Sequence, residues 1–391
     1  MSNRASRRAV MGLTIMRTVL TAGTGRLRSH RARYRTAAGL GIVSAALLAP
    51  LMAPAAQAAA PAPAATPLTA AAAAAPVAAP ASAVTVSSTP AVDTFWTAAR
   101  MRTATPREAP PATPAQVRRA SASVPRTGSP VSIAPARPLT TTAPGVPAPR
   151  RAPLPATVNY GHTWPGAASQ TPTRTTGKVF FRDARGGTWV CSGSSVATES
   201  RLVVFTAGHC VFDLTTKSYY RNWTYVPGYK NGSAPYGSWT ARELWTLKGW
   251  HDGTWPAAIP YDTAAAVLNL RSGKRIQNVV GGNGVSWNQP ATQTVYALGY
   301  PAESPFNGQT LRYCLGTTFT DANFGSRGLG CTMNGGSSGG PWLRAYNSRS
   351  GYGYLNGNTS YSYQNNLTRL YAPYYGSAQG ALYNAVRHRY Q

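Results

Sequence analysis

The first 155 residues are rich in alanine and proline, and this composition limits where the chain can build a folded core. Within the stretch 59–155, Ala70–Ala75 is an unbroken alanine run and proline recurs every few residues. Such a segment buries too little apolar surface to offset the conformational entropy of ordering it. A core of ordinary density is therefore expected only in residues 156–391, a length that suits one large or two small packed units.

Residues 1–58 have the pattern of a secretory signal. Arginines crowd the first 35 positions, an apolar stretch follows from Ala37 to Ala53, and Ala56-Gln-Ala58 is a small-x-small cleavage motif. We expect cleavage after Ala58 and a protein that is secreted to the extracellular space. A retained membrane anchor is the alternative, although two prolines in and just after the apolar stretch disfavour a continuous spanning helix.

The stretch 59–155 is interpreted as an Ala/Pro-rich, low-complexity pro-segment or linker, disordered or extended with polyproline character. A folded prodomain is the alternative, but a periodic apolar pattern is missing, and only Val92–Met101 has the composition of a short helix. Pro-rich sequence persists to Pro155, and the first convincing strand begins at Lys178. We therefore expect the mature chain to begin between residues 150 and 178.

Residues 156–391 are predicted to be all-β. Short runs of β-branched and aromatic residues alternate with clusters of Gly, Pro, Asn and Ser, a pattern typical of sandwiches and barrels. The predicted strands are Val179–Arg182, Thr188–Cys191, Arg201–Phe205, Asn222–Tyr229, Ser238–Leu247, Ala264–Leu270, Thr294–Gly299, Leu311–Phe319, Pro341–Tyr346 and Tyr352–Asn356. One short helix is predicted near the C-terminus, at Ser377–Arg387, because its apolar residues lie four apart.

The four cysteines fall into two pairs, Cys191 with Cys210 and Cys314 with Cys331. Four cysteines allow three disulfide connectivities. Joining neighbours closes loops of 18 and 16 intervening residues, each stabilising the fold by roughly 3 kcal/mol in the chain-entropy model. A zinc site needs closely spaced ligand pairs such as C-x-x-C, which this chain lacks, and no Asp/Glu cluster suggests calcium. We expect disulfides between neighbours, and no metal or cofactor.

Three short segments carry residue types suited to nucleophilic catalysis. Phe205–Cys210 leads a strand directly into His209, Gly335–Pro341 is a glycine-rich turn that presents Ser338, and Asp262 immediately precedes an apolar strand. A serine hydroxyl becomes a nucleophile when a neighbouring base takes its proton, and a carboxylate behind that base fixes its tautomer. Glycines let two backbone N–H groups point at one spot, where they stabilise an oxyanion.

Together these segments resemble the trypsin-like (chymotrypsin-fold) serine peptidases, over residues 160–391. Thr206-Ala-Gly-His-Cys210 and Gly336-Ser-Ser-Gly-Gly-Pro341 are similar to the histidine and serine motifs of that family, and the chain order His, Asp, Ser is the same. The pattern is closer to the bacterial secreted branch, which includes glutamyl-endopeptidase-like enzymes. The resemblance implies two six-stranded antiparallel β-barrels, about 175–275 and about 280–375, with the site between them.

The resemblance also implies a role for each residue. His209 is the general base, Asp262 its orienting acid and Ser338 the nucleophile of a serine endopeptidase that hydrolyses peptide bonds through an acyl-enzyme. The backbone N–H groups of Gly336 and Ser338 form the oxyanion hole. The implied disulfides are Cys191–Cys210, which braces the histidine loop, and Cys314–Cys331, which braces loops near the specificity pocket.

Other residues compete for the acid and base roles. Asp213 lies only four residues past His209, in what should be the same loop. Asp252 lies in the polar loop Gly249–Gly253 and has no strand directly after it. His251 is an alternative base, but nothing around it resembles the family motif. We therefore prefer Asp262 with His209.

Two departures from the family bear on activation and specificity. Ser337 stands where animal members have Asp, so a new N-terminal amine would find no charged partner there. Thr332, six residues before Ser338, is not acidic, so a deep pocket for Arg or Lys is not supported. Thr332, Thr359 and Ser360 are the candidates for a small polar substrate pocket.

Two other classes of function remain open. An inactive peptidase-fold module that binds cell wall or protein is the alternative, and the complete set of three residues disfavours it. Nucleic-acid binding is suggested by a pI near 10.7, but 18 arginines and only two acids fall in the first 155 residues, and the rest lacks a basic-aromatic motif. No nucleic-acid partner is expected. The charge that remains favours anionic cell-wall polymers or acidic substrates. We expect a monomer that acts on proteins or peptides.

Overall fold

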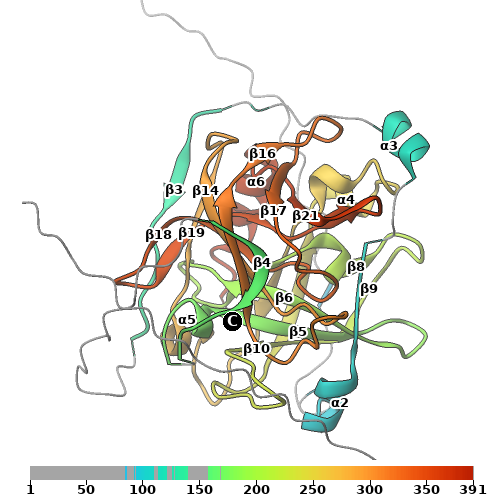
Figure 1. Ribbon diagram of the computed structural model, residues 1–391. Coiled ribbons are helices and arrows are strands. Elements are labelled where there is room, and N and C mark those ends of the chain that lie inside the picture. The colour runs from blue at the N-terminus through green and yellow to red at the C-terminus, as the bar shows by residue number, and fades with distance from the viewer. Residues whose placement is uncertain are drawn as a thin grey trace, which may run out of the picture. The chain divides into compact units, whose positions relative to one another are not determined.

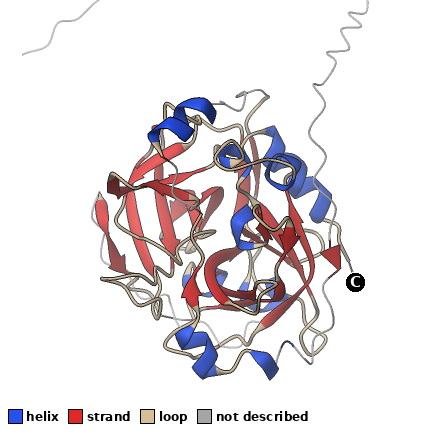
Figure 2. Ribbon diagram, turned by 90° about the vertical axis from the view of Figure 1, so that its right-hand side faces the viewer, coloured by secondary structure: helices blue, strands red, loops and turns tan. Residues whose placement is uncertain are grey.

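The computed structural model describes residues 84–85, 92, 94–109, 113–120, 126, 128–139, 157–167 and 169–390 (Figure 1). The predicted secretory signal, residues 1–58, lies outside them. In the described part of the chain, no helix is both long and apolar enough to cross a membrane. Most regular structure is strand, and the helices are short (Figure 2), which confirms the predicted fold class.

The first half of the domain is a closed barrel of six antiparallel strands. Its strands are β5 (Thr176–Arg182), β6 (Thr188–Ser195), β7 (Val203–Thr206), β10 (Arg221–Pro227), β11 (Trp239–Thr246) and β12 (Ala264–Leu268). The hydrogen-bonded order is β11-β10-β5-β6-β7-β12, and pairing of β12 with β11 closes the ring. Successive residues of β5 belong to different apolar clusters, Val179 and Phe181 to one and Phe180 to another, as the period of two along a strand requires.

The second half is assembled from two sheets. The larger has the order β3-β13-β19-β18-β14-β15-β4, and the smaller has the order β16-β17-β21-β20. The strands of the larger sheet are β3 (Val131–Ile133), β4 (Val158–Thr163), β13 (Gly284–Trp287), β14 (Thr294–Gly299), β15 (Arg312–Thr317), β18 (Pro341–Asn347) and β19 (Tyr352–Asn358). Those of the smaller sheet are β16 (Phe319–Thr320), β17 (Arg327–Gly330), β20 (Tyr361–Tyr363) and β21 (Asn366–Ala372).

The predicted C-terminal helix is present as α6 (Ser377–Val386). Its residues Leu382 and Val386 are fully buried in a cluster shared with both halves of the domain. Short elements occupy the connections: η1 (Thr173–Thr175), η2 (Gly208–Cys210), β8 (Phe212–Asp213), β9 (Ser218–Tyr219), α4 (Lys248–His251), η3 (Ile259–Tyr261) and α5 (Ile276–Val280).

All ten predicted strands are present, with ends shifted by a few residues. The strands that the sequence did not reveal are rich in glycine or polar residues, such as β17 with the sequence Arg-Gly-Leu-Gly and β4 with Val-Asn-Tyr-Gly-His-Thr. Neither has the alternation of apolar and polar residues that marks a half-buried strand. The first strand after the low-complexity stretch is β4, which begins at Val158, whereas the sequence placed the first convincing strand at Lys178.

The described residues of 84–139, which we call the leading segment, differ from the expectation of a disordered stretch. They form β1 (Val84–Thr85), α2 (Ala98–Thr103), β2 (Thr105–Pro106), α3 (Pro114–Ala120) and β3. In Figure 1, α2 and α3 lie at opposite ends of the molecule. Trp96 is buried against Phe180, and Val117 is buried in a cluster with Ile259. A few large apolar side chains, spaced along an Ala/Pro-rich sequence, are enough to attach the leading segment to the rest of the protein.

Candidate active site

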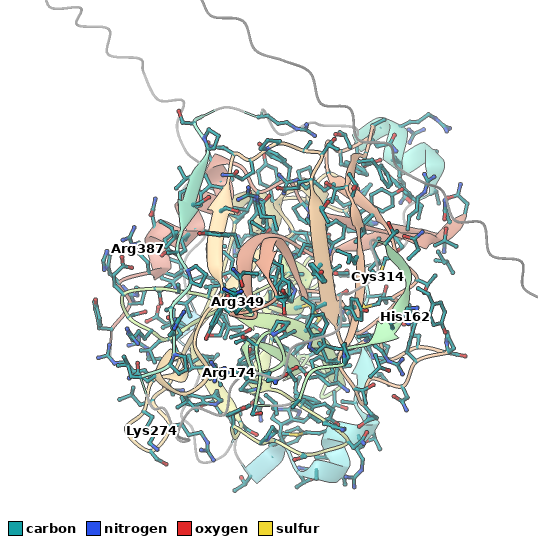
Figure 3. All side chains as sticks on the ribbon, turned by 60° about the vertical axis from the view of Figure 1, so that its left-hand side comes forward. His162, Arg174, Lys274, Cys314, Arg349 and Arg387 are labelled. Atoms are coloured by element: carbon teal, nitrogen blue, oxygen red, sulfur yellow. A yellow bond between two sulfur atoms is a disulfide. The ribbon has the colours of Figure 1, made fainter. Side chains whose placement is uncertain are left out.

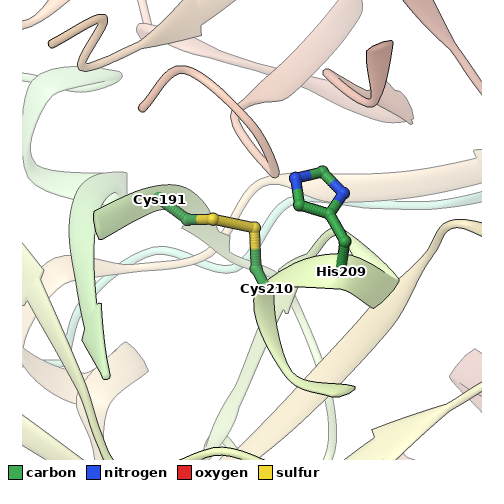
Figure 4. Close-up of side chains that lie close together, drawn as sticks. All are labelled: Cys191, His209 and Cys210. Atoms are coloured by element: carbon green, nitrogen blue, oxygen red, sulfur yellow. A yellow bond between two sulfur atoms is a disulfide. The ribbon is translucent and has the colours of Figure 1, made fainter. Parts of the chain in front are cut away.

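His209 lies in the short turn η2, which follows β7 without a loop. The neighbouring Cys210 is joined to Cys191 on β6 by a disulfide (Figure 4). Gly208 must be a glycine because a Cβ there would stand 2.8 Å from the Trp250 ring. The turn is thus held by a covalent bond on one side and by an indole on the other, and this fixes the backbone that carries the His209 ring.

Asp262 is fully buried, and its carboxylate accepts three hydrogen bonds. It follows η3 and directly precedes β12, as predicted. One oxygen accepts from the backbone N–H of His209 at 2.8 Å, and the other lies 2.8 Å from the His209 Nδ1 atom. The Ser360 hydroxyl donates to the same second oxygen at 2.5 Å. Because an ionised carboxylate only accepts, Nδ1 carries the proton and Nε2 is left as the basic nitrogen.

The glycine-rich turn that carries Ser338 is closed by its own residues. Gly336 and Gly339 have φ values of +91° and +77°, in the region that favours glycine. Both the backbone N–H and the hydroxyl of Ser337 donate to the carbonyl of Asn334, at 3.0 and 2.6 Å. The carbonyl of Ser338 accepts from Ser192 N–H at 2.7 Å. Ser337 therefore occupies the turn with a neutral hydrogen bond, where animal members of the family place a carboxylate.

Three polar groups at this place have no partner among the described residues. The buried Nε2 atom of His209 has no hydrogen bond. The backbone N–H groups of Gly336 and Ser338 also donate to no described residue. Nε2 and the Ser338 hydroxyl are not hydrogen-bonded to each other. In serine peptidases and other enzymes, such a bond often forms only when substrate is bound. A base with a free lone pair and two unused donors can together support attack on a carbonyl.

The structure brings Asp262, and neither Asp213 nor Asp252, to His209. The Asp213 carboxylate instead accepts from the Arg107 guanidinium at 3.2 Å. Asp252 lies next to His251, whose Nδ1 is 2.6 Å from it, and it also pairs with Lys248. The proposed base is therefore His209 alone. His162, on β4, pairs with Tyr313 of β15, the residue that precedes Cys314 (Figure 3).

The three candidates for a substrate pocket have different surroundings. Thr332 lines a hollow together with Asn159, Tyr160, Phe319, Gly330, Thr368 and Arg369. The Thr359 hydroxyl accepts from the Trp342 indole at 3.1 Å, and the Ser360 hydroxyl is used by Asp262. Both are buried. Only Thr332 presents a side chain to an open hollow, so Ser360 is better described as a partner of Asp262.

Both cysteine pairs are disulfides between neighbours in the chain, Cys191–Cys210 and Cys314–Cys331. Within the described residues, Cys191, His209 and Cys210 form a cluster of three potential metal ligands. Both of its sulfur atoms are consumed in the disulfide, so they cannot act as thiolate ligands.

Sequence reasoning missed Glu108, which lies at the site, and the preceding Arg107, which lies in a separate hollow with Asp213. The Glu108 side chain keeps contact with solvent, although many protein atoms lie near its carboxylate. One of its oxygens lies 2.5 Å from where a Cβ of Gly335 would stand. Desolvation, and then the nearby Glu303 carboxylate, raise the pKa of Glu108 to about 7, and His209 acts against this. One sequence signal was available: Glu108 is one of only two acids in the first 155 residues.

Comparisons with known proteins agree with this geometry. No family model matches the chain. A glutamyl endopeptidase of Bacillus licheniformis is 31% identical over 115 residues, which are 29% of this chain and 33% of that protein, so the chain spans about a third of this relative. The crystal structure of protease Anisep from Arthrobacter nicotinovorans is 40% identical, with a TM-score of 0.51, and the match covers 56% of this chain and 97% of Anisep.

The serine protease AL20, from an extremophilic microorganism and described as thermostable, gives a similar match. It is 37% identical, with a TM-score of 0.52, over 56% of this chain and 98% of AL20. Two relatives that are matched over nearly their whole length are therefore proteases, and the fold and motifs found here agree with theirs. The chain belongs to the trypsin-like, chymotrypsin-fold serine peptidases.

Proposed function

We propose that the protein is a secreted serine endopeptidase that hydrolyses peptide bonds through an acyl-enzyme on Ser338. The observation that carries this proposal is the pair of hydrogen bonds that His209 donates to the Asp262 carboxylate, from its backbone N–H and its Nδ1 atom, which leaves a buried, unpaired Nε2 atom. Such an arrangement is suited to a general base and has no evident use in a module that only binds. Secretion rests on the predicted signal at residues 1–58.

In the proposed mechanism, His209 Nε2 takes the proton of the Ser338 hydroxyl as its oxygen attacks the substrate carbonyl. The oxygen of the tetrahedral intermediate accepts from the N–H groups of Gly336 and Ser338, and preorganised donors of this kind supply the largest electrostatic stabilisation. His209 then gives its proton to the leaving amine, and a water molecule repeats the sequence to release the acid. Asp262 remains ionised and stabilises the imidazolium.

The turn around Ser337 supports a site that needs no inserted terminal amine. Its backbone N–H and hydroxyl both reach Asn334, so the turn is closed by local neutral bonds. A free amine would find no carboxylate on Ser337 with which to pair. We therefore expect the oxyanion hole to form whichever residue begins the mature chain.

The proposed substrates are proteins or peptides, taken up by a monomer. Residues 156–391 hold 20 basic and 8 acidic residues, a net charge of +12, and this positive field attracts anionic polymers, including those of a cell wall, at low ionic strength.

The test compares Ser338→Ala with Ser362→Ala, a matched control on the nearby strand β20. Protein recovered from the culture medium is assayed on casein and labelled with a serine-directed fluorophosphonate. We expect Ser338→Ala to retain less than about a thousandth of the wild-type kcat and to lose labelling, while Ser362→Ala retains both. Activity that survives in Ser338→Ala, or a label found on another residue, would contradict the assignment.

A further inference from the structure

Residues 105–109 of the leading segment, which we call the covering segment, run across the proposed site. The strand β2 pairs in parallel with β6, with Thr105 opposite Trp189 and Pro106 opposite Val190. The Arg107 N–H then donates to the Val190 carbonyl at 3.0 Å. Val190 immediately precedes Cys191, whose disulfide partner follows His209. The covering segment therefore reaches the site from the side of the proposed base.

Beyond Arg107, the covering segment extends to the other side of the site. A Glu108 oxygen lies over Gly335, the residue before the proposed oxyanion donor Gly336. Glu108 is also near enough to His209 for the charge of His209 to affect its titration. A substrate must place its carbonyl at the N–H groups of Gly336 and Ser338, and its leaving amine at His209. The covering segment and a substrate thus compete for the same space.

The Arg107 side chain is bound in a pocket of acidic and aromatic residues. Its Nε donates to the Tyr220 hydroxyl at 2.9 Å, and its Nη2 donates to Asp213 at 3.2 Å. The guanidinium lies 5.1 Å from the centre of the Trp189 ring. Asp213 is itself held by the N–H of Thr215 at 2.8 Å, and Asp183 lines the same hollow. A guanidinium that pairs with a carboxylate and lies over an indole makes a specific anchor.

Two buried side chains attach the leading segment on either side of the covering segment. Upstream, Trp96 packs against Phe180 of the barrel, and its indole donates to the Asn222 carbonyl at 2.7 Å. Downstream, Val117 is buried in a cluster that includes Ile259 and Tyr361. The covering segment is therefore held across the site between two attachment points, one on the first barrel and one beside the second half of the domain.

We propose that the covering segment is an internal inhibitor, anchored by Arg107 in the pocket of Trp189, Asp213 and Tyr220. This inference rests on the proposed serine peptidase function, because it concerns access to Ser338. In the intact chain, the covering segment excludes substrate from Ser338 and His209. Loss of the Arg107 anchor opens the site without altering any residue of the proposed catalytic set.

The experiment measures how fast a fluorophosphonate labels Ser338 in the full-length chain, with mass spectrometry to verify that each chain is intact before and after labelling. Arg107→Ala removes the anchor. Asp213→Asn removes the charge of its partner while keeping an oxygen for the Thr215 N–H. Arg118→Ala, an exposed arginine on α3, is the matched control, and Ser338→Ala supplies the background.

We expect Arg107→Ala and Asp213→Asn each to raise the labelling rate by about tenfold or more, since losing one partner of a hydrogen-bonded charge pair weakens docking. Arg118→Ala should label at the wild-type rate. The charge-reversed double variant Arg107→Asp with Asp213→Arg should return towards slow labelling. If circular dichroism shows that Arg107→Ala fails to fold, the labelling rate of Asp213→Asn alone tests the internal inhibitor.

Two results separate this inference from the function on which it rests. If the wild-type chain labels at Ser338 as fast as Arg107→Ala and Asp213→Asn, the peptidase stands and the internal inhibitor is wrong. If none of the chains labels at Ser338, even after a protease has removed the leading segment, the proposed function itself is wrong.

Discussion

Two carboxylates of the domain at residues 157–390 have different settings: Asp262 binds His209 within the domain, and Asp213 binds Arg107 of the leading segment. In the domain, Asp262 is fully buried and accepts three hydrogen bonds from residues of that domain. Toward the leading segment, Asp213 keeps 12% of its side chain exposed and pairs with Arg107, a residue outside the domain. A buried, fully bonded carboxylate orients a base permanently, whereas a partly exposed pair at an interface can open.

The largest expected effect concerns these two acids. Asp262→Asn should lower kcat by about 10⁴-fold, because an amide cannot favour the correct His209 tautomer in the same way. Asp213→Asn, the matched control, should leave kcat almost unchanged once the leading segment has been removed. The measurement is kcat on one peptide substrate for both processed variants. An equal loss in both would show that the two carboxylates do not differ in role.

The second prediction compares a buried tryptophan in each region. Trp223 lies inside the first barrel and donates to the Cys210 carbonyl at 3.0 Å, while Trp96 belongs to the leading segment. Trp223→Ala should lower the free energy of unfolding of the domain by about 3–5 kcal/mol, the usual cost of removing a large core side chain.

Trp96→Ala should instead leave the unfolding of the domain almost unchanged and make the leading segment more sensitive to proteolysis. Chemical denaturation reports the first quantity, and the rate of cleavage within residues 94–109 reports the second. If Trp96→Ala destabilised the domain as much as Trp223→Ala, the leading segment would be part of the core and could not leave it independently.

The third prediction concerns pH. The pKa of Glu108 is raised from 4.5 to about 7 when the covering segment is docked, by desolvation and by Glu303, and His209 partly offsets this. The docked state therefore binds a proton more tightly than the released state. Docking is strongest below about pH 4.5, and it weakens as the pH rises through about 7.

The measurement is the ratio of fluorophosphonate labelling rates of the full-length wild type and of Glu108→Gln. Between about pH 5 and 8 this ratio should rise by about tenfold, less than the full shift would give, because Glu108 keeps contact with water. Taking the ratio removes any effect of pH that the two chains share. A ratio that stays flat with pH would show that Glu108 does not control docking.

The smallest expected effect concerns the start of the mature chain. Chains that begin at residues 152 or 156 should have kcat/KM values within about twofold of each other, because Ser337 offers no carboxylate to a terminal amine. A chain that begins at residue 165 lacks β4, which pairs with β15 and whose Asn159 carbonyl accepts from Thr332 N–H at 3.0 Å. It should have a lower Tm. One active start site with inactive neighbours would show that the terminal amine belongs to the site.

The sequence predicted most of the strands that carry β-branched and aromatic residues. The strand β5, Thr-Gly-Lys-Val-Phe-Phe-Arg, is of this kind. The strands β4 and β17 were not readable, because their pairing depends on neighbours that are distant in the chain and not on their own composition. The leading segment was misjudged for a related reason. Its average composition predicts disorder, while its attachment depends on single residues such as Trp96 and Val117.

The candidate site divides in the same way. The sequence by itself determined the residue types and their order, because the motifs around His209 and Ser338 are local and their glycines are required by the turn. It favoured Asp262 as the partner of His209, with Asp213 and Asp252 as alternatives. The tertiary structure decided among them, because Asp262 is 53 residues from His209 in the chain and reaches it only when β12 pairs with β7. The binding of Arg107 to Asp213, and the position of Glu108 beside Gly335, were likewise decided by tertiary structure, since no local pattern encodes a contact made 106 residues away.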